Sequence, residues 1–65
     1  MNRLLYAVKE VIREEDYRKY DFNTVLKSAI PCWDNTAVMI SASDFVMVFD
    51  KISYELLSYT GFDIK

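Results

Sequence analysis

The side chains that most often carry out catalysis are scarce in this sequence of 65 residues. There is no histidine, which excludes the Ser–His and Cys–His pairs that activate a nucleophile near neutral pH. Cys32 is the only cysteine, and it lies between Pro31 and Trp33 with no base beside it. We interpret it as a small, partly buried apolar side chain rather than a reactive thiol. One cysteine without histidine also excludes an internal disulfide and a Cys/His zinc site.

Carboxylates are the remaining groups with catalytic potential, since a well-spaced pair can hydrolyse a bond by acid–base chemistry. Acidic residues gather in the segment 14–21, but basic residues stand among them. Two acids precede a base by four positions, the spacing that stabilises a solvated helix face: the pairs are Glu14–Arg18 and Glu15–Lys19. We therefore expect no enzymatic activity, no cofactor and no metal site.

Composition also excludes several classes of ligand. A net charge of −2 lacks the basic footprint of a nucleic-acid binder, and a single glycine, Gly61, cannot build a glycine-rich phosphate loop. The longest apolar run, residues 45–49, is far shorter than the ~20 residues that span a membrane. Lys9 and Glu10 interrupt the N-terminal apolar stretch too early for a signal peptide. We expect a cytoplasmic protein, in the host cytoplasm if its origin is viral, with no direct nucleic-acid or membrane contact.

The elements that must position any functional side chain begin with a predicted helix over about residues 3–19. Its apolar residues, including Leu4, Val8 and Ile12, fall on one side at helical spacing. Asn2 is a suitable N-cap, and no glycine or proline interrupts the segment.

A shorter helix is predicted over about residues 22–30. Asp21 is its expected N-cap, and the residues that follow repeat the apolar spacing of a core-facing stripe. Pro31 ends this helix because proline disfavours helical geometry in the residue before it. Residues 31–36 then form a turn-rich connection.

The C-terminal half is ambiguous between helix and strand. Its apolar residues cluster on one side of a helical wheel, and Gly61 stands where a helix commonly ends: the cluster is Phe45, Val48, Phe49, Ile52, Leu56 and Tyr59. We favour a long helix over about residues 42–60. The prediction is an all-α fold, a compact three-helix domain (long, short, long) that occupies residues 1–65. The alternative is an α+β fold with a short hairpin at about residues 37–49.

More apolar residues are present than one small core can use. Aromatic residues and arginine, which are enriched at the energetic centres of interfaces, fall on the outer sides of the first and third predicted helices. Trp33, in the loop, is interpreted either as a cap on the core or as an anchor for a partner. The candidate partner-binding residues are Tyr6, Arg13, Tyr17, Tyr20, Trp33, Met47 and Tyr54.

These features predict a small intracellular protein-binding module. We expect a steric inhibitor or adaptor of the kind encoded by phages and mobile elements, which docks on a larger protein through an aromatic helical face. A homodimer or other homo-oligomer is compatible with the second apolar face. Two alternatives remain open at this point. One is an acidic DNA mimic that inhibits a nucleic-acid-binding protein, and the other is a structural subunit of a larger assembly.

Overall fold

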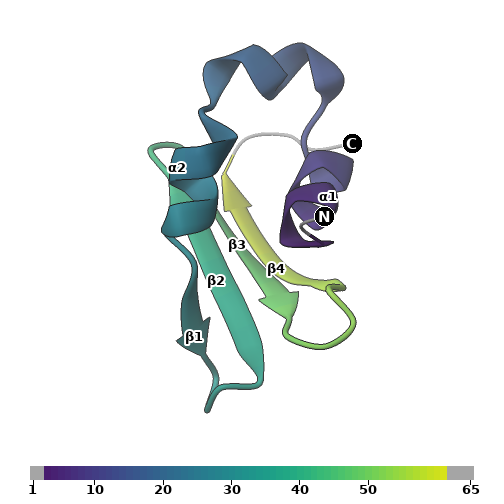
Figure 1. Cartoon of the computed structure of the whole chain (residues 1–65), viewed down its shortest axis with the longest axis vertical. Helices are drawn as coiled ribbons and strands as arrows, with labels where there is room; N and C mark the ends of the chain where they lie inside the picture. Colours follow the sequence, from purple (N-terminus) through teal and green to yellow (C-terminus); the bar gives the residue numbers. More distant parts are fainter. Residues whose placement is uncertain (1–2, 62–65) are drawn as a thin grey trace.

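The protein is an α+β unit in which short helices precede a four-stranded antiparallel sheet (Figure 1). The computed structural model describes residues 3–61. In chain order the elements are α1 (Arg3–Val11), a 3₁₀ helix η1 (Glu14–Lys19), α2 (Phe22–Lys27), β1 (Ile30–Cys32), β2 (Ala37–Ala42), β3 (Phe45–Asp50) and β4 (Leu56–Gly61). The strands pair in the order β1-β2-β3-β4, so the sheet is a simple antiparallel meander.

The all-α prediction is wrong, and its long third helix is replaced by β3, a loop and β4. The hairpin considered at residues 37–49 corresponds to β2 and β3, which pair from Ala37 opposite Asp50 to Ala42 opposite Phe45. Neither reading of the sequence included β1 or β4. Met47, placed on the outer side of that helix, therefore has a different position, and its side chain is completely buried.

Residues 45–49 fit a helical wheel because apolar residues of β3 lie on both faces of the sheet. Phe45, Met47 and Phe49 point to the helices and belong to the core, whereas Val48 points to the opposite face and is also buried. A strand with apolar residues on both faces has a continuous apolar run instead of alternation, and such a run fits a helix equally well.

The first predicted helix is divided into two. α1 ends at Val11, and η1 follows after a short break. The predicted i,i+4 ion pairs do not form in η1; instead Lys19 lies 2.9 Å from Asp16, three positions earlier. This change follows from 3₁₀ geometry, which aligns side chains at i and i+3. Asn2, the predicted N-cap of this helix, lies outside the described residues.

The second helix begins as predicted and ends earlier. The carboxylate of Asp21 accepts a hydrogen bond from the backbone N–H of Asn23 (3.1 Å), which confirms Asp21 as the N-cap. α2 stops at Lys27, and Pro31 lies in the edge strand β1 rather than after a helix. Proline is tolerated in an edge strand because its missing N–H need not pair with a neighbour.

The sheet has one covered face and one open face within the described chain. The helices pack on the covered face, where the core cluster joins Leu4, Val8, Ile12 and Val25 to Ile40, Phe45, Met47 and Phe49. The register places Ile30, Met39 and Val46 on the other face. Val48 pairs with Ser58 and Phe49 with Leu56, so Leu57 is an extra residue that forms a bulge in β4.

Gly61 ends β4, not a helix as predicted. Its φ of +148° is a conformation that L side chains rarely adopt. A Cβ at this position would lie 2.6 Å from the carbonyl oxygen of Asp44 and 2.8 Å from Cβ of Phe45. The close approach of β4 to the β2–β3 turn therefore requires glycine here.

Two features of residues 3–61 concern membrane insertion and metal binding. None of the helices there combines the length and the apolar character needed to cross a bilayer. The same part of the chain contains no cluster of three or more acidic or cysteine side chains that could hold a metal ion.

Candidate interaction site at the Trp33 end of the sheet

Backbone strain is concentrated at one end of the sheet. Four non-glycine residues have a positive φ: Trp33 (51°), Asp34 (56°), Asn35 (65°) and Tyr54 (61°). The first three form the β1–β2 turn, and Tyr54 lies in the β3–β4 loop. In an antiparallel meander these two connections lie at the same end, the lower end in Figure 1, which we call the Trp33 end.

The β1–β2 turn is held by hydrogen bonds to its own backbone. Both the backbone N–H (3.1 Å) and the side-chain hydroxyl (2.6 Å) of Thr36 donate to the carbonyl oxygen of Trp33. The carbonyl of Thr36 then accepts from the backbone N–H of Lys51 (3.2 Å), which joins this turn to the β3–β4 loop. The ring of Trp33 is 55% exposed, so Trp33 does not cap the core.

The β3–β4 loop is organised by Asp50. Its carboxylate accepts the backbone N–H groups of Ile52 and Ser53, each at 2.8 Å, and these hydrogen bonds lower the pKa of Asp50. The carbonyl of Asp50 accepts a hydrogen bond from the backbone N–H of Tyr54 (3.0 Å). The backbone N–H of Asp50 donates to the carbonyl of Glu55 (2.8 Å). The loop therefore fixes the left-handed Tyr54 without glycine or proline.

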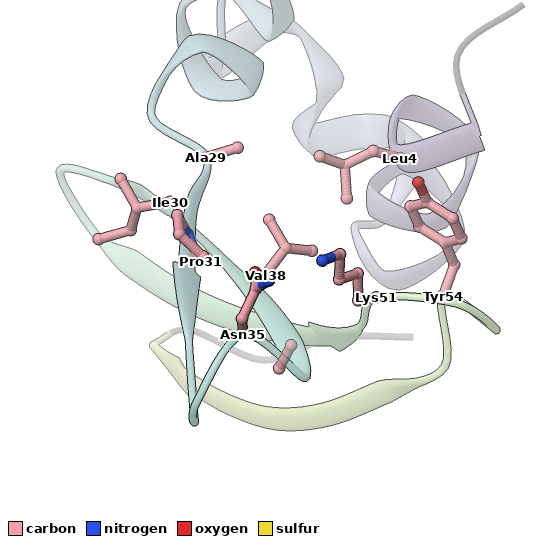
Figure 2. A pocket seen from close by; sticks show the side chains of 9 residues that line it. Leu4, Ala29, Ile30, Pro31, Asn35, Val38, Lys51 and Tyr54 are labelled. Carbon is pink, nitrogen blue, oxygen red and sulfur yellow. The ribbon is translucent and has the colours of Figure 1, made fainter.

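A cavity of about 350 Å³ opens between α1 and the two connections at the Trp33 end (Figure 2). Its walls are aliphatic and come from Leu4, Ala29, Ile30, Pro31, Ala37 and Val38. The polar groups in its lining belong to Asn35, Lys51 and Tyr54. In Figure 2 the Lys51 side chain extends toward Val38, and the Tyr54 ring stands opposite. Two of the four left-handed residues, Asn35 and Tyr54, thus line this pocket.

A second cation stands beside this pocket. The guanidinium of Arg3 lies 4.7 Å from the centroid of the Tyr54 ring, within the range of a cation–π contact. Lys51 lines the pocket from the β3–β4 loop, whereas Arg3 contacts Tyr54 from α1. No acidic side chain of the described chain lines the pocket. The pocket combines an apolar floor with positive charge near its rim.

The predicted partner-binding residues do not form one surface. Trp33 and Tyr54 lie at the Trp33 end, whereas Tyr6 is exposed on α1 and Arg13 is exposed before η1. The remaining three are engaged inside the protein: Tyr17, Tyr20 and Met47 all contact or belong to the core. The continuous aromatic helical face predicted for residues 6–20 is therefore absent from the described structure.

Tyr17 and Tyr20 connect the helices to the rest of the fold. The hydroxyl of Tyr17 donates to the carbonyl of Lys9 (2.7 Å), and its ring meets Phe22 edge-on at 5.7 Å. The ring of Tyr20 packs on Phe45 at 5.2 Å, and its hydroxyl lies 2.9 Å from a carboxylate oxygen of Asp44. Burial, and secondarily this hydrogen bond, raise the pKa of Tyr20. Both residues are half-buried and pack against the core.

Sequence reasoning missed Asn35 and Lys51 as site residues. Lys51 falls within the long helix predicted over residues 42–60, and its place beside Asn35 at the pocket depends on the pairing of β2 with β3, where Ala37 lies opposite Asp50. An acidic DNA mimic would use the carboxylates of the C-terminal half, which are Asp34, Asp44, Asp50, Glu55 and Asp63. Asp34, Asp44 and Glu55 lie in three different connections, so they are spread apart along the sheet. Asp63, the last of that set, lies outside the described residues.

The comparisons with known proteins supply no further assignment. This chain matches no protein-family model, and no curated protein or solved structure matches it significantly.

Proposed function

We propose that this chain is a small protein-binding module that docks on a larger protein through the β1–β2 turn, with Trp33 as the anchor. It acts by occupying a surface of that partner, as an inhibitor or adaptor does, rather than by catalysis. The observation that carries the proposal is an exposed tryptophan that begins a strained turn. Tryptophan is the residue type most enriched at the energetic centres of protein interfaces.

The conformation of the turn supports this role. A left-handed conformation costs a non-glycine residue roughly 1–2 kcal/mol, with a smaller cost for Asp and Asn. Strain of this kind persists where the surrounding structure imposes it, and it is common at binding sites. Three consecutive left-handed residues hold Trp33 outward in a fixed backbone geometry. A fixed anchor loses little conformational entropy on binding, which favours affinity.

The charge beside the anchor indicates the chemistry of the partner. Asp34 follows Trp33, is exposed, and forms no ion pair with residues 3–61. The complementary surface is an apolar pocket, deep enough for an indole ring, with a basic residue at its rim. Burial of about 800 Å² on each side is the ordinary size for such a complex.

The test compares Trp33 with an exposed aromatic residue elsewhere. The immobilised full chain is used to capture proteins from a lysate of cells that produce it, beside the variants Trp33→Ala and Tyr6→Ala. Tyr6 is a matched control because it is 52% exposed but lies on an ordinary helix. We expect one partner to be captured by the wild type and by Tyr6→Ala and lost with Trp33→Ala, a loss of affinity of about 2 kcal/mol or more.

The single tryptophan also supplies a direct reading of the contact. Trp33 is the only tryptophan, so its fluorescence reports its own environment in a complex with a purified, tryptophan-free fragment of the partner. We expect emission to shift to shorter wavelength as the ring leaves water. Loss of the partner with Tyr6→Ala but not with Trp33→Ala would show that the helical surface binds and that the proposal is wrong.

A further inference from the structure

The pocket at the Trp33 end has features that point to a specific class of ligand. From these features we infer that it binds the C-terminal residue of a partner chain, with an aliphatic side chain inside the pocket and the α-carboxylate on Lys51. The inference rests on the proposed function because it names the part of a protein partner that this end recognises.

The shape and lining of the pocket select an aliphatic group. Its volume of about 350 Å³ lies at the lower end of the range for small-molecule sites, so a single side chain and its backbone suit it better than a large ligand. Leu4 lines it from α1, Val38 from β2 and Pro31 from the edge strand (Figure 2), whereas the side chain of Ile30 points away from it. Apolar burial here is non-directional, so the aliphatic walls supply affinity rather than orientation.

The charges around the pocket select a carboxylate. Lys51 extends into the pocket and forms no ion pair with the described residues. The adjacent carboxylate of Asp50 is already used by two backbone N–H groups of its own loop. Arg3 contacts the ring of Tyr54, which also lines the pocket, and adds a positive charge in its surroundings. An anion placed beside Lys51 would thus meet a cation and no lining acid, and a lysine–carboxylate hydrogen bond is charge-assisted.

Asn35 favours a peptide over a simple fatty acid. Its side-chain amide offers one acceptor and two donors, which match the N–H and C=O of a peptide bond. The turn holds Asn35 in a left-handed conformation at the pocket, two residues from Trp33. A chain terminus seated on Lys51 therefore has a partner for its last peptide group, and the rest of the bound protein is directed toward the Trp33 anchor.

The experiment is an NMR titration of the ¹⁵N-labelled full chain with three probes. They are acetyl-Ala-Ala-Leu with a free α-carboxylate, the same peptide with a C-terminal amide, and octanoate. We expect the free-acid peptide to shift the backbone signals of Val38, Asn35 and Tyr54 with a dissociation constant of ~0.1–1 mM. Amidation should weaken binding about tenfold because it removes the charge-assisted hydrogen bond.

Variants of the chain test whether Lys51 binds the α-carboxylate of the peptide. Lys51→Gln should weaken binding of the free-acid peptide about tenfold, and it should not further weaken binding of the amidated peptide. Arg18→Gln is the matched control, since it removes one exposed positive charge on η1 and should leave the affinity unchanged. The backbone spectrum of each variant shows directly that the fold is intact.

Each contrary outcome is informative. Equal affinity for the acid and the amide overturns the inference. So does the absence of any shift of the pocket signals when the peptide concentration is about tenfold above a dissociation constant of ~1 mM. Tighter binding of octanoate than of the peptide also overturns it, because the site then prefers a free aliphatic acid. If the peptide fails while the captured partner still depends on Trp33, the proposed function stands and only this inference is wrong. If the peptide binds as expected and Trp33→Ala still captures the partner, the docking role of Trp33 is wrong.

Discussion

The two ends of the sheet differ in the residue types that adopt a positive φ. At the Asp44 end, formed by the β2–β3 turn and the end of β4, the position with a positive φ and no room for a Cβ is occupied by Gly61. At the Trp33 end, four residues with positive φ all carry side chains. Glycine would adopt those conformations with less strain. On the proposed function, the exposed side chains of Trp33 and Asp34 are kept for the partner rather than for the fold.

The two ends also differ in what their polar groups contact. At the Asp44 end, Tyr20 donates to the Asp44 carboxylate and packs on Phe45, so its polar and aromatic groups bind each other. At the Trp33 end the indole is exposed, and Asp34 and Lys51 form no ion pair with residues 3–61. On the proposed function, the Asp44 end stabilises the fold, and the Trp33 end presents these groups to a partner. Substitutions at each end test this division.

Gly61→Val should have the largest effect, because it places a branched side chain where a single Cβ already meets the Asp44 carbonyl at 2.6 Å. We expect the free energy of unfolding to fall by about 3 kcal/mol, from backbone strain and overpacking together. Chemical denaturation followed by circular dichroism measures it. Thr60→Val, at the exposed preceding position, is the control and should change stability by no more than about 0.5 kcal/mol. Similar effects of both variants would contradict the close approach.

Tyr20→Phe should have an intermediate effect. It removes the hydrogen bond to Asp44 and keeps the ring on Phe45, so we expect a loss of about 1 kcal/mol near neutral pH. Tyr6→Phe, at an exposed position, is the control and should have no measurable effect. The same denaturation experiment compares the two variants.

The pH dependence of the free energy of unfolding is an independent test of the contribution of Tyr20. Because the folded-state pKa of Tyr20 is raised, the folded chain keeps this proton at pH values where the unfolded chain, with a tyrosine pKa of about 10, has lost it. The unfolded state then binds fewer protons, so the free energy of unfolding falls as pH rises above about 10. Tyr20→Phe should reduce this alkaline slope. An unchanged slope in that variant would show that other groups cause it.

Asp34→Gly should have the smallest effect and the opposite sign. It relieves the left-handed conformation at a position whose side chain is exposed. We expect the free energy of unfolding to rise by up to about 0.5 kcal/mol, since the greater freedom of glycine in the unfolded chain offsets part of the gain. Thermal unfolding measures the shift. A decrease of more than about 1 kcal/mol would show that Asp34 stabilises the turn and that its presence needs no functional explanation.

The N-terminal part of the fold was the more predictable from sequence. The inward side of α1 was identified through Leu4 and Val8, and Asp21 was recognised as an N-cap because both signals are local. The division between α1 and η1 was missed, since no glycine or proline marks it. The hydroxyl of Tyr17 binds the carbonyl of Lys9 across this break, and that contact appears only in three dimensions.

The sheet was missed because one of its connections carries no turn signal. Turns are recognised in sequence chiefly by glycine and proline. The connection at residues 31–36 was predicted as turn-rich, and the structure places the β1–β2 turn there. The β3–β4 loop contains neither glycine nor proline, so β3 and β4 were joined into one helix. Trp33 and Tyr54 were named beforehand, whereas Lys51 and Asn35 depend on strand pairing.

The most direct test of the central claim is a single variant, Trp33→Gly, with stability and partner capture both measured. Relief of the left-handed conformation should offset the lost contacts of a half-exposed ring, so we expect the free energy of unfolding to stay within ~1 kcal/mol of the wild type. Partner capture should be lost. A fall in stability of more than ~2 kcal/mol with capture retained would show that Trp33 serves the fold, and the account of the Trp33 end would be contradicted.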